Sequence, residues 1–185
     1  MIDDVKQDAE HRMEGALDAL LRELNSVRTG RASPALVERM TIDYYGTPTP
    51  LNQLAGISAP EPRLLVIQPW DRGAMQAIER SIQQSNLGLN PNNDGSVIRL
   101  NIPPLTEERR RDLTKIVHGK TEDAKVAIRN VRRDAIDHTK ELLKEKMIGE
   151  DDERRAEHEI QQLTDRFIAR ADELGKAKEA EVLEV

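Results

Sequence analysis

Apolar side chains recur at steps of three and four residues through three long segments of this 185-residue chain. This spacing puts apolar groups on one face of a helix, and such a face has to be buried against another element. The first segment ends near Thr29 and Gly30, the second runs from Thr106 to about Met147, and the third starts at Asp151. The sequence therefore predicts three long amphipathic helices.

The residues expected to face inward follow from the same spacing, and Thr106 with Glu107 and Glu108 behind it is typical of a capped helix start. We expect these inward positions: Ile2, Val5, Ala9, Met13, Ala16/Leu17, Leu20, Leu24 and Val27 in the first helix; Leu113, Ile116/Val117, Ala124, Ala127/Ile128, Val131, Ala135, Thr139 and Leu142/Leu143 in the second; Ala156, Ile160, Leu163, Phe167, Ala171 and Leu174 in the third. Because none of these helices can bury its face alone, we predict a three-helix bundle.

The section between the first and second helices has a different character, since it holds all nine prolines. Alternation from Met40 to Tyr44 predicts a strand that ends at the Gly46–Pro50 turn, and residues 63–67 predict a second strand. Asp71 can cap a short helix that carries Met75, Ile78 and Ile82. Asp94-Gly95 is a tight-turn signal between residues 89–92 and Ile98, Leu100 and Ile102. This section reads as a small β/α/β domain.

The predicted fold class is therefore α+β, with a bundle of residues 1–29 and 106–185 and an inserted β/α/β domain of residues 30–105. The chain crosses between the two parts twice. The crossings contain Thr29, Gly30 and Arg31, and then Pro103, Pro104 and Leu105. A junction of two short tethers with few contacts predicts hinge motion.

Composition argues against most enzyme classes. The chain has no cysteine, and its four histidines (His11, His118, His138 and His158) are too far apart for helical metal-ligand spacing. It shows no phosphate-binding loop, no dinucleotide fingerprint and no nucleophile beside a base. We therefore expect neither metal nor cofactor. With no secretory signal and no apolar run of about 20 residues, we expect a soluble cytoplasmic protein.

The net charge of −6 hides one strongly basic segment. Residues 109–133 carry nine basic and three acidic side chains, whereas residues 148–185 carry six basic and twelve acidic ones. A polyanion responds to the local patch and not to the total charge. The basic segment is therefore the candidate binding site.

At helical spacing, Lys125, Arg129 and Arg132 share one face of the second long helix, with Arg133 at its edge and Arg110 returning to nearly the same face. Arginine offers a planar set of donors that suits phosphate. The segment has no aromatic residue, which favours structured RNA bound through its backbone over stacked single strands. Two alternatives remain open: the basic face pairs with the acidic third helix, or the helices form a scaffold for a protein partner.

Five motifs together resemble the ribosome recycling factor family over essentially the whole chain. They are Arg28-Thr29-Gly30-Arg31-Ala32-Ser33-Pro34, the run Tyr44–Leu51, Leu87–Asn92, Pro103–Arg110 and Arg129-Asn130-Val131-Arg132-Arg133-Asp134-Ala135. The run Tyr44–Leu51 also has a structural interpretation as a turn plus core.

The resemblance implies an L-shaped monomer with tRNA-like dimensions. It implies binding to the post-termination ribosome and, with elongation factor G and GTP, dissociation of the subunits and release of mRNA and tRNA. The GTP belongs to the partner, so no enzyme activity is expected of this chain. In the family, the arginines that match Arg132 and Arg129, supported by Arg110, contact large-subunit ribosomal RNA, and the segments that match Arg28–Arg31 and Pro103–Leu105 form the hinge.

Overall fold

The computed structural model describes residues 1–184, and the chain divides into two compact units. One unit comprises Met1–Arg28 together with the chain from Thr106 onward, and the other comprises Thr29–Leu105. None of the helices in residues 1–184 combines the length and apolar character that a membrane span requires.

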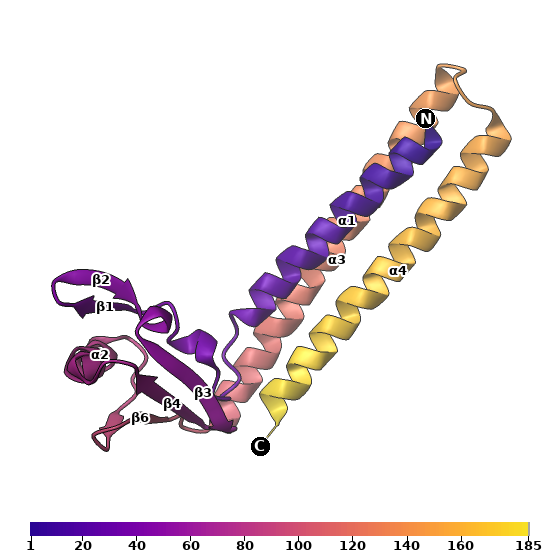
Figure 1. Cartoon of the computed structure of the whole chain (residues 1–185). Coiled ribbons are helices and arrows are strands. Elements are labelled where there is room, and N and C mark those ends of the chain that lie inside the picture. Colours follow the sequence, from indigo (N-terminus) through magenta and orange to yellow (C-terminus); the bar gives the residue numbers. More distant parts are fainter. Residues whose placement is uncertain (185) are drawn as a thin grey trace. The chain divides into compact units, whose positions relative to one another are not determined.

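The first unit is a three-helix bundle, as predicted (Figure 1). Its helices are α1 (Ile2–Asn25), α3 (Glu107–Lys144) and α4 (Glu150–Leu183), so α1 and α3 each end about three residues before the predicted stops. Interhelical ion pairs define the directions of the helices. α1 runs antiparallel to α3, since Arg12 pairs with Asp134 and Glu23 with Lys120. It runs parallel to α4, since Glu10 pairs with Arg166 and Glu14 with Arg170.

Both predicted helix starts in the bundle carry side-chain caps. The hydroxyl oxygen of Thr106 accepts a hydrogen bond from the Arg109 backbone N–H at 3.1 Å. At the start of α4, the Asp152 carboxylate accepts from the Gly149 N–H. Such contacts satisfy donors that have no partner inside the helix.

The buried face of α4 differs in part from the predicted stripe. Leu163 and Leu174 are only half-buried, and their neighbours Thr164 and Gly175 face inward instead. Threonine fits there because its hydroxyl donates to the carbonyl of Ile160 one turn earlier, which leaves only its methyl group to pack. Thr121 and Thr139 on α3 are buried in the same way. Ile116, a predicted alternative to Val117, is exposed.

Gly175 lets α3 and α4 approach closely. A methyl group at Gly175 would lie 2.5 Å from Oγ1 and 3.0 Å from Cγ2 of Thr121, a side chain that is buried and already hydrogen bonded. Gly119 on α3 is an exposed helical glycine with open space around it.

We therefore expect opposite effects from the same substitution at these two glycines. Gly175→Ala should lower the free energy of unfolding by about 1–3 kcal/mol, because overpacking outweighs the gain in helix propensity. Gly119→Ala should raise it by up to about 1 kcal/mol, because only propensity changes. Urea denaturation of both variants measures this, and stabilisation by Gly175→Ala would contradict the close packing.

The second unit contains two antiparallel sheets and one helix (Figure 1). A two-stranded sheet joins β1 (Thr41–Tyr44) to β2 (Thr47–Pro50). The other sheet has the order β3-β4-β6-β5, with β3 at Ala55–Glu61, β4 at Leu64–Pro69, β6 at Ile98–Asn101 and β5 at Pro91–Asn93. The helix is α2 (Met75–Gln84).

The strands predicted near residues 40–44, 63–67 and 98–102 are confirmed, whereas β2 was wrongly interpreted as a turn and β3 was missed. Both lie at a sheet edge, where proline is tolerated because one side of the strand needs no hydrogen-bonding partner. In β3 the pairing register also shifts between Ser58 and Glu61. Proline and irregular pairing together remove the alternation by which a strand is recognised.

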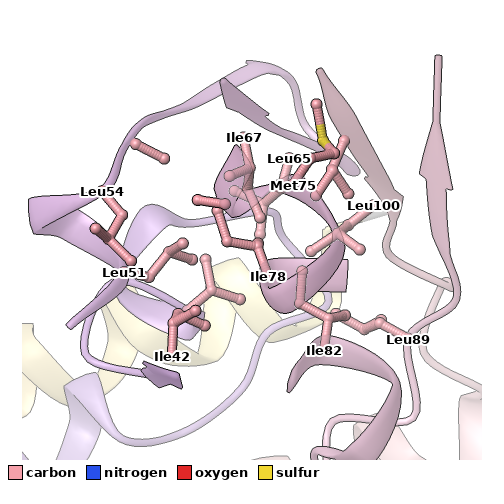
Figure 2. Packing of buried hydrophobic residues seen from close by; sticks show 14 of the residues in the cluster. Ile42, Leu51, Leu54, Leu65, Ile67, Met75, Ile78, Ile82, Leu89 and Leu100 are labelled. Carbon is pink, nitrogen blue, oxygen red and sulfur yellow. The ribbon is translucent and has the colours of Figure 1, made fainter. Parts of the chain in front are cut away.

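The core of the second unit lies between α2 and the sheets, and Figure 2 shows its aliphatic side chains converging. Fully buried members include Ile42, Leu51, Leu65, Ile67, Ile78, Ile82, Ile98 and Leu100. As predicted, the Asp71 carboxylate accepts from the Gly73 N–H, although the first turn is a short 3-10 helix, η3 (Arg72–Ala74). The Asp94-Gly95 turn is also confirmed. Hydrogen bonds from the Val97 and Ser96 N–H groups and from Arg99 lower the pKa of Asp94 to about 2.

Candidate nucleic-acid interface

The candidate basic residues on α3 lie in different electrostatic surroundings. The Lys125 side chain, 18% exposed, lies 3.1 Å from Asp172 on α4 and 3.7 Å from Glu122. Arg129 is 44% exposed and lies 3.3 Å from Glu122 on its own helix. Arg133 is exposed and has no ion pair or hydrogen bond with any residue in 1–184. Arg110 is half-buried.

Arg132 is half-buried, yet its partner is an amide and not a carboxylate. Its Nη1 donates to Oε1 of Gln161 on α4 at 2.8 Å. Gln161 in turn donates through Nε2 to Oδ1 of Asp165 at 2.8 Å. Within the described residues, the buried Nε of Arg132 has no hydrogen-bond partner. The guanidinium is therefore held in place while no carboxylate neutralises it directly.

The sequence left open that the basic face pairs with the acidic third helix, and this alternative applies to one of these side chains. Lys125 does pair with the acidic third helix, and the resulting charge is compensated inside the bundle. The Arg129–Glu122 pair is solvent-exposed, and such pairs contribute little and dissociate readily. Arg132 and Arg133 keep uncompensated charge on α3.

Several other cations in the bundle are matched by carboxylates on neighbouring helices. Hydrogen bonds from Arg170 and Lys120 lower the pKa values of Glu14 and Glu23, respectively. Lys6, Arg12 and Arg166 likewise pair with Glu159, Asp134 and Glu10. Arg132 differs from these cations, because the residue opposite it on α4 is a neutral amide.

This arrangement can bind a phosphate group. The Nη2 group and one N–H of Nη1 of Arg132 make no hydrogen bond to a described residue, and a guanidinium can offer two parallel donors to a phosphate. Arg133 and Arg129 add exposed charge within one turn on the same helix. No group of three or more histidine, aspartate or glutamate side chains among residues 1–184 could hold a metal ion.

Gln161 is the residue of this site that the sequence analysis missed. Gln161 is uncharged and lies on an acidic helix, so the distribution of charge in the sequence does not indicate it. Its role depends on which α3 residue lies opposite, and that register is known only from the packed helices. The pairing of Lys125 with Asp172 could not be predicted either, because it depends on the same register between α3 and α4.

The expected hinge residues lie in two segments without helix or strand. In the first segment Gly30 has a φ of +77°, and a methyl group there would lie 3.1 Å from Cγ of Leu105 in the second. On the side of the sheet unit, the Ala32 N–H donates to the carbonyl of Pro62 and the Ile102 N–H to that of Arg63. Both segments are thus tied to the β3–β4 turn just beyond the expected hinge positions.

Comparison with known proteins gives one consistent result. The family model described as "Ribosome recycling factor" matches residues 20–183. The ribosome-recycling factors of Thermomicrobium roseum and Carboxydothermus hydrogenoformans are 60% and 57% identical over 185 residues, which is the full length of both chains in each case.

Two solved structures are also similar. The solution structure of a ribosome recycling factor is 44% identical, has a TM-score of 0.76, and is matched over 100% of this chain and 98% of that one. The other comes from models of the T. thermophilus ribosome recycling factor and E. coli elongation factor G bound to the E. coli post-termination complex. It is 48% identical over the full length of both chains, with a TM-score of 0.65.

Proposed function

The chain belongs to the ribosome recycling factor family, and from this premise we propose that it binds the post-termination ribosome. With elongation factor G and GTP it then promotes dissociation of the subunits and release of mRNA and tRNA. It acts as a monomer in the cytoplasm and has no catalytic residues of its own, since the GTP is hydrolysed by the partner. Support comes from full-length similarity to named recycling factors, one of them placed with elongation factor G on a post-termination complex.

The proposed contact with large-subunit ribosomal RNA is made by α3, with Arg132 at its centre. The observation that carries this assignment is the half-buried guanidinium held by the Gln161 amide, because it keeps its charge and free donors. Arg129, Arg133 and Arg110 support it. Lys125 contributes least, because Asp172 already compensates its charge.

A subunit-splitting assay tests the proposed function. Post-termination ribosomes are mixed with this protein, elongation factor G and GTP, and dissociation is followed by light scattering. We expect fast splitting only when all three are present. Splitting no faster than with elongation factor G and GTP alone would refute the function. A protein-interaction scaffold, the rival function, would bind its partner with little dependence on salt.

We also propose that residues 29–31 and 103–105 form a hinge between the two units. The supporting observations are that both segments lack helix and strand, and that backbone hydrogen bonds fix the chain just beyond them, at Ala32 and Ile102. NMR relaxation should give different rotational correlation times for the bundle and the sheet unit. A single correlation time for all ordered residues would reject the hinge.

A further inference from the structure

The Arg132 guanidinium is oriented by a relay of two hydrogen bonds that ends on α4. We propose that Gln161 and Asp165 are positioning residues, which hold Arg132 ready for a phosphate group of RNA without neutralising it. This inference rests on the proposed function, because it assumes that Arg132 contacts ribosomal RNA. Gln161 and Asp165 are one helical turn apart, so they present their side chains on the same side of α4.

The order of donors and acceptors in this relay is fixed by chemistry. An ionised carboxylate can only accept, so Asp165 must receive the NH2 group of Gln161. The amide oxygen of Gln161 is then turned toward Arg132, which can only donate. Asp165 thus prevents the amide from flipping and placing two donors against each other.

The choice of an amide over a carboxylate decides how much charge remains. A glutamate at position 161 would form an ion pair with Arg132, like the one between Asp172 and Lys125 two turns away along α3. A neutral oxygen accepts one N–H and leaves the positive charge for an outside anion. Asp165, whose oxygen bonds the amide, affects Arg132 only through Gln161.

If Gln161 and Asp165 position Arg132, they should raise the affinity of the protein for ribosomal RNA. Ordering a long side chain on binding costs about 0.5–1.5 kcal/mol, which corresponds to about 2- to 12-fold in the dissociation constant. If the relay already orders Arg132 in the free protein, removing the relay restores this cost. It does so only while Arg132 is present.

The test compares Gln161→Met with its neighbour control Gln162→Met, since Gln162 is an exposed glutamine on the same helix. Binding to purified large ribosomal subunits is measured for both variants, for Arg132→Ala, and for Arg132→Ala combined with Gln161→Met. We expect Gln161→Met to weaken binding about 2- to 12-fold, Gln162→Met to change nothing, and Gln161→Met to have no further effect in the Arg132→Ala background.

Gln161→Glu separates positioning from a structural role. It should bind at least as weakly as Gln161→Met, and the slope of log K against log salt should fall by about 0.7–0.9, as when one phosphate contact is lost. Its melting temperature should change little, because the new ion pair with Arg132 offsets the lost hydrogen bond to Asp165 and the repulsion between the two carboxylates. The inference would be overturned if the loss of binding in Gln161→Met and Gln161→Glu simply tracked a fall in their melting temperatures.

The outcomes also separate the inference from the function. If Arg132→Ala weakens binding but Gln161→Met does not, or if the two losses add, the positioning role is wrong and the RNA interface stands. If Arg132→Ala leaves binding unchanged, the proposed interface fails and the positioning role fails with it.

Discussion

Replacing Arg132 with alanine should weaken binding to the large ribosomal subunit by about 12- to 150-fold, since hydrogen bonds to charged groups contribute about 1.5–3 kcal/mol. The fold should persist. The substitution removes one hydrogen bond to the half-buried Gln161 and also a buried Nε without a partner, so stability should change by less than about 1 kcal/mol. A pelleting assay measures binding, and circular dichroism measures the fold.

A control for this substitution is Arg154→Ala on α4, because Arg154 is 76% exposed and lies 3.8 Å from Glu150. It removes a guanidinium of the same kind from outside the candidate interface and should leave binding unchanged. Arg129→Ala and Arg133→Ala should give smaller losses than Arg132→Ala, and Lys125→Ala the smallest. Undiminished binding by Arg132→Ala would count against the whole ranking.

The largest loss of stability is expected at Phe167. This side chain is 1% exposed in the bundle, and the guanidinium groups of Arg166 and Arg170 lie 5.6 and 5.1 Å from its ring centroid. Phe167→Ala should lower the free energy of unfolding by about 3–5 kcal/mol, because the variant no longer buries the apolar ring and leaves a cavity in its place.

Denaturation followed by circular dichroism at a helical wavelength measures this loss, since the three long helices dominate the signal. The control Phe167→Leu keeps most of the apolar volume and should cost about 1.5 kcal/mol or less. A loss below about 1 kcal/mol for Phe167→Ala would mean that the ring does not fill the bundle core.

The long helices could be predicted from the sequence because their signals are local. Spacing of apolar residues, the Thr106 cap and the Gly149 break depend on neighbours within one or two turns. The hairpin at Asp94-Gly95 is equally local. These elements were predicted correctly, apart from a few residues at the helix ends.

What the sequence analysis missed depends on residues far apart in the chain. Thr164 and Gly175 face inward in place of Leu163 and Leu174 because α3 packs closely against α4, where Gly175 meets Thr121. The strands β2 and β3 were not predicted because their prolines are tolerated only at a sheet edge, and edge position follows from the assembled sheet.

The candidate site shows the same division. Charge counting located the basic segment of α3, but it could not tell which cations remain uncompensated. That distinction depends on the register of α3 against α4, which sets Asp172 beside Lys125 and Gln161 beside Arg132. Lys125 and Arg132, which lie in the same basic segment of the sequence, therefore have different expected roles.

The central claim is that uncompensated guanidinium groups on α3 hold ribosomal RNA through its phosphates. The most direct measurement is the affinity for large subunits across a range of salt concentrations, for the unaltered protein and for Arg132→Ala. The claim predicts a steep linear fall of log K with log salt, and a slope smaller by about 0.7–0.9 in the variant. Affinity that barely changes with salt, or the same slope for both proteins, would contradict it.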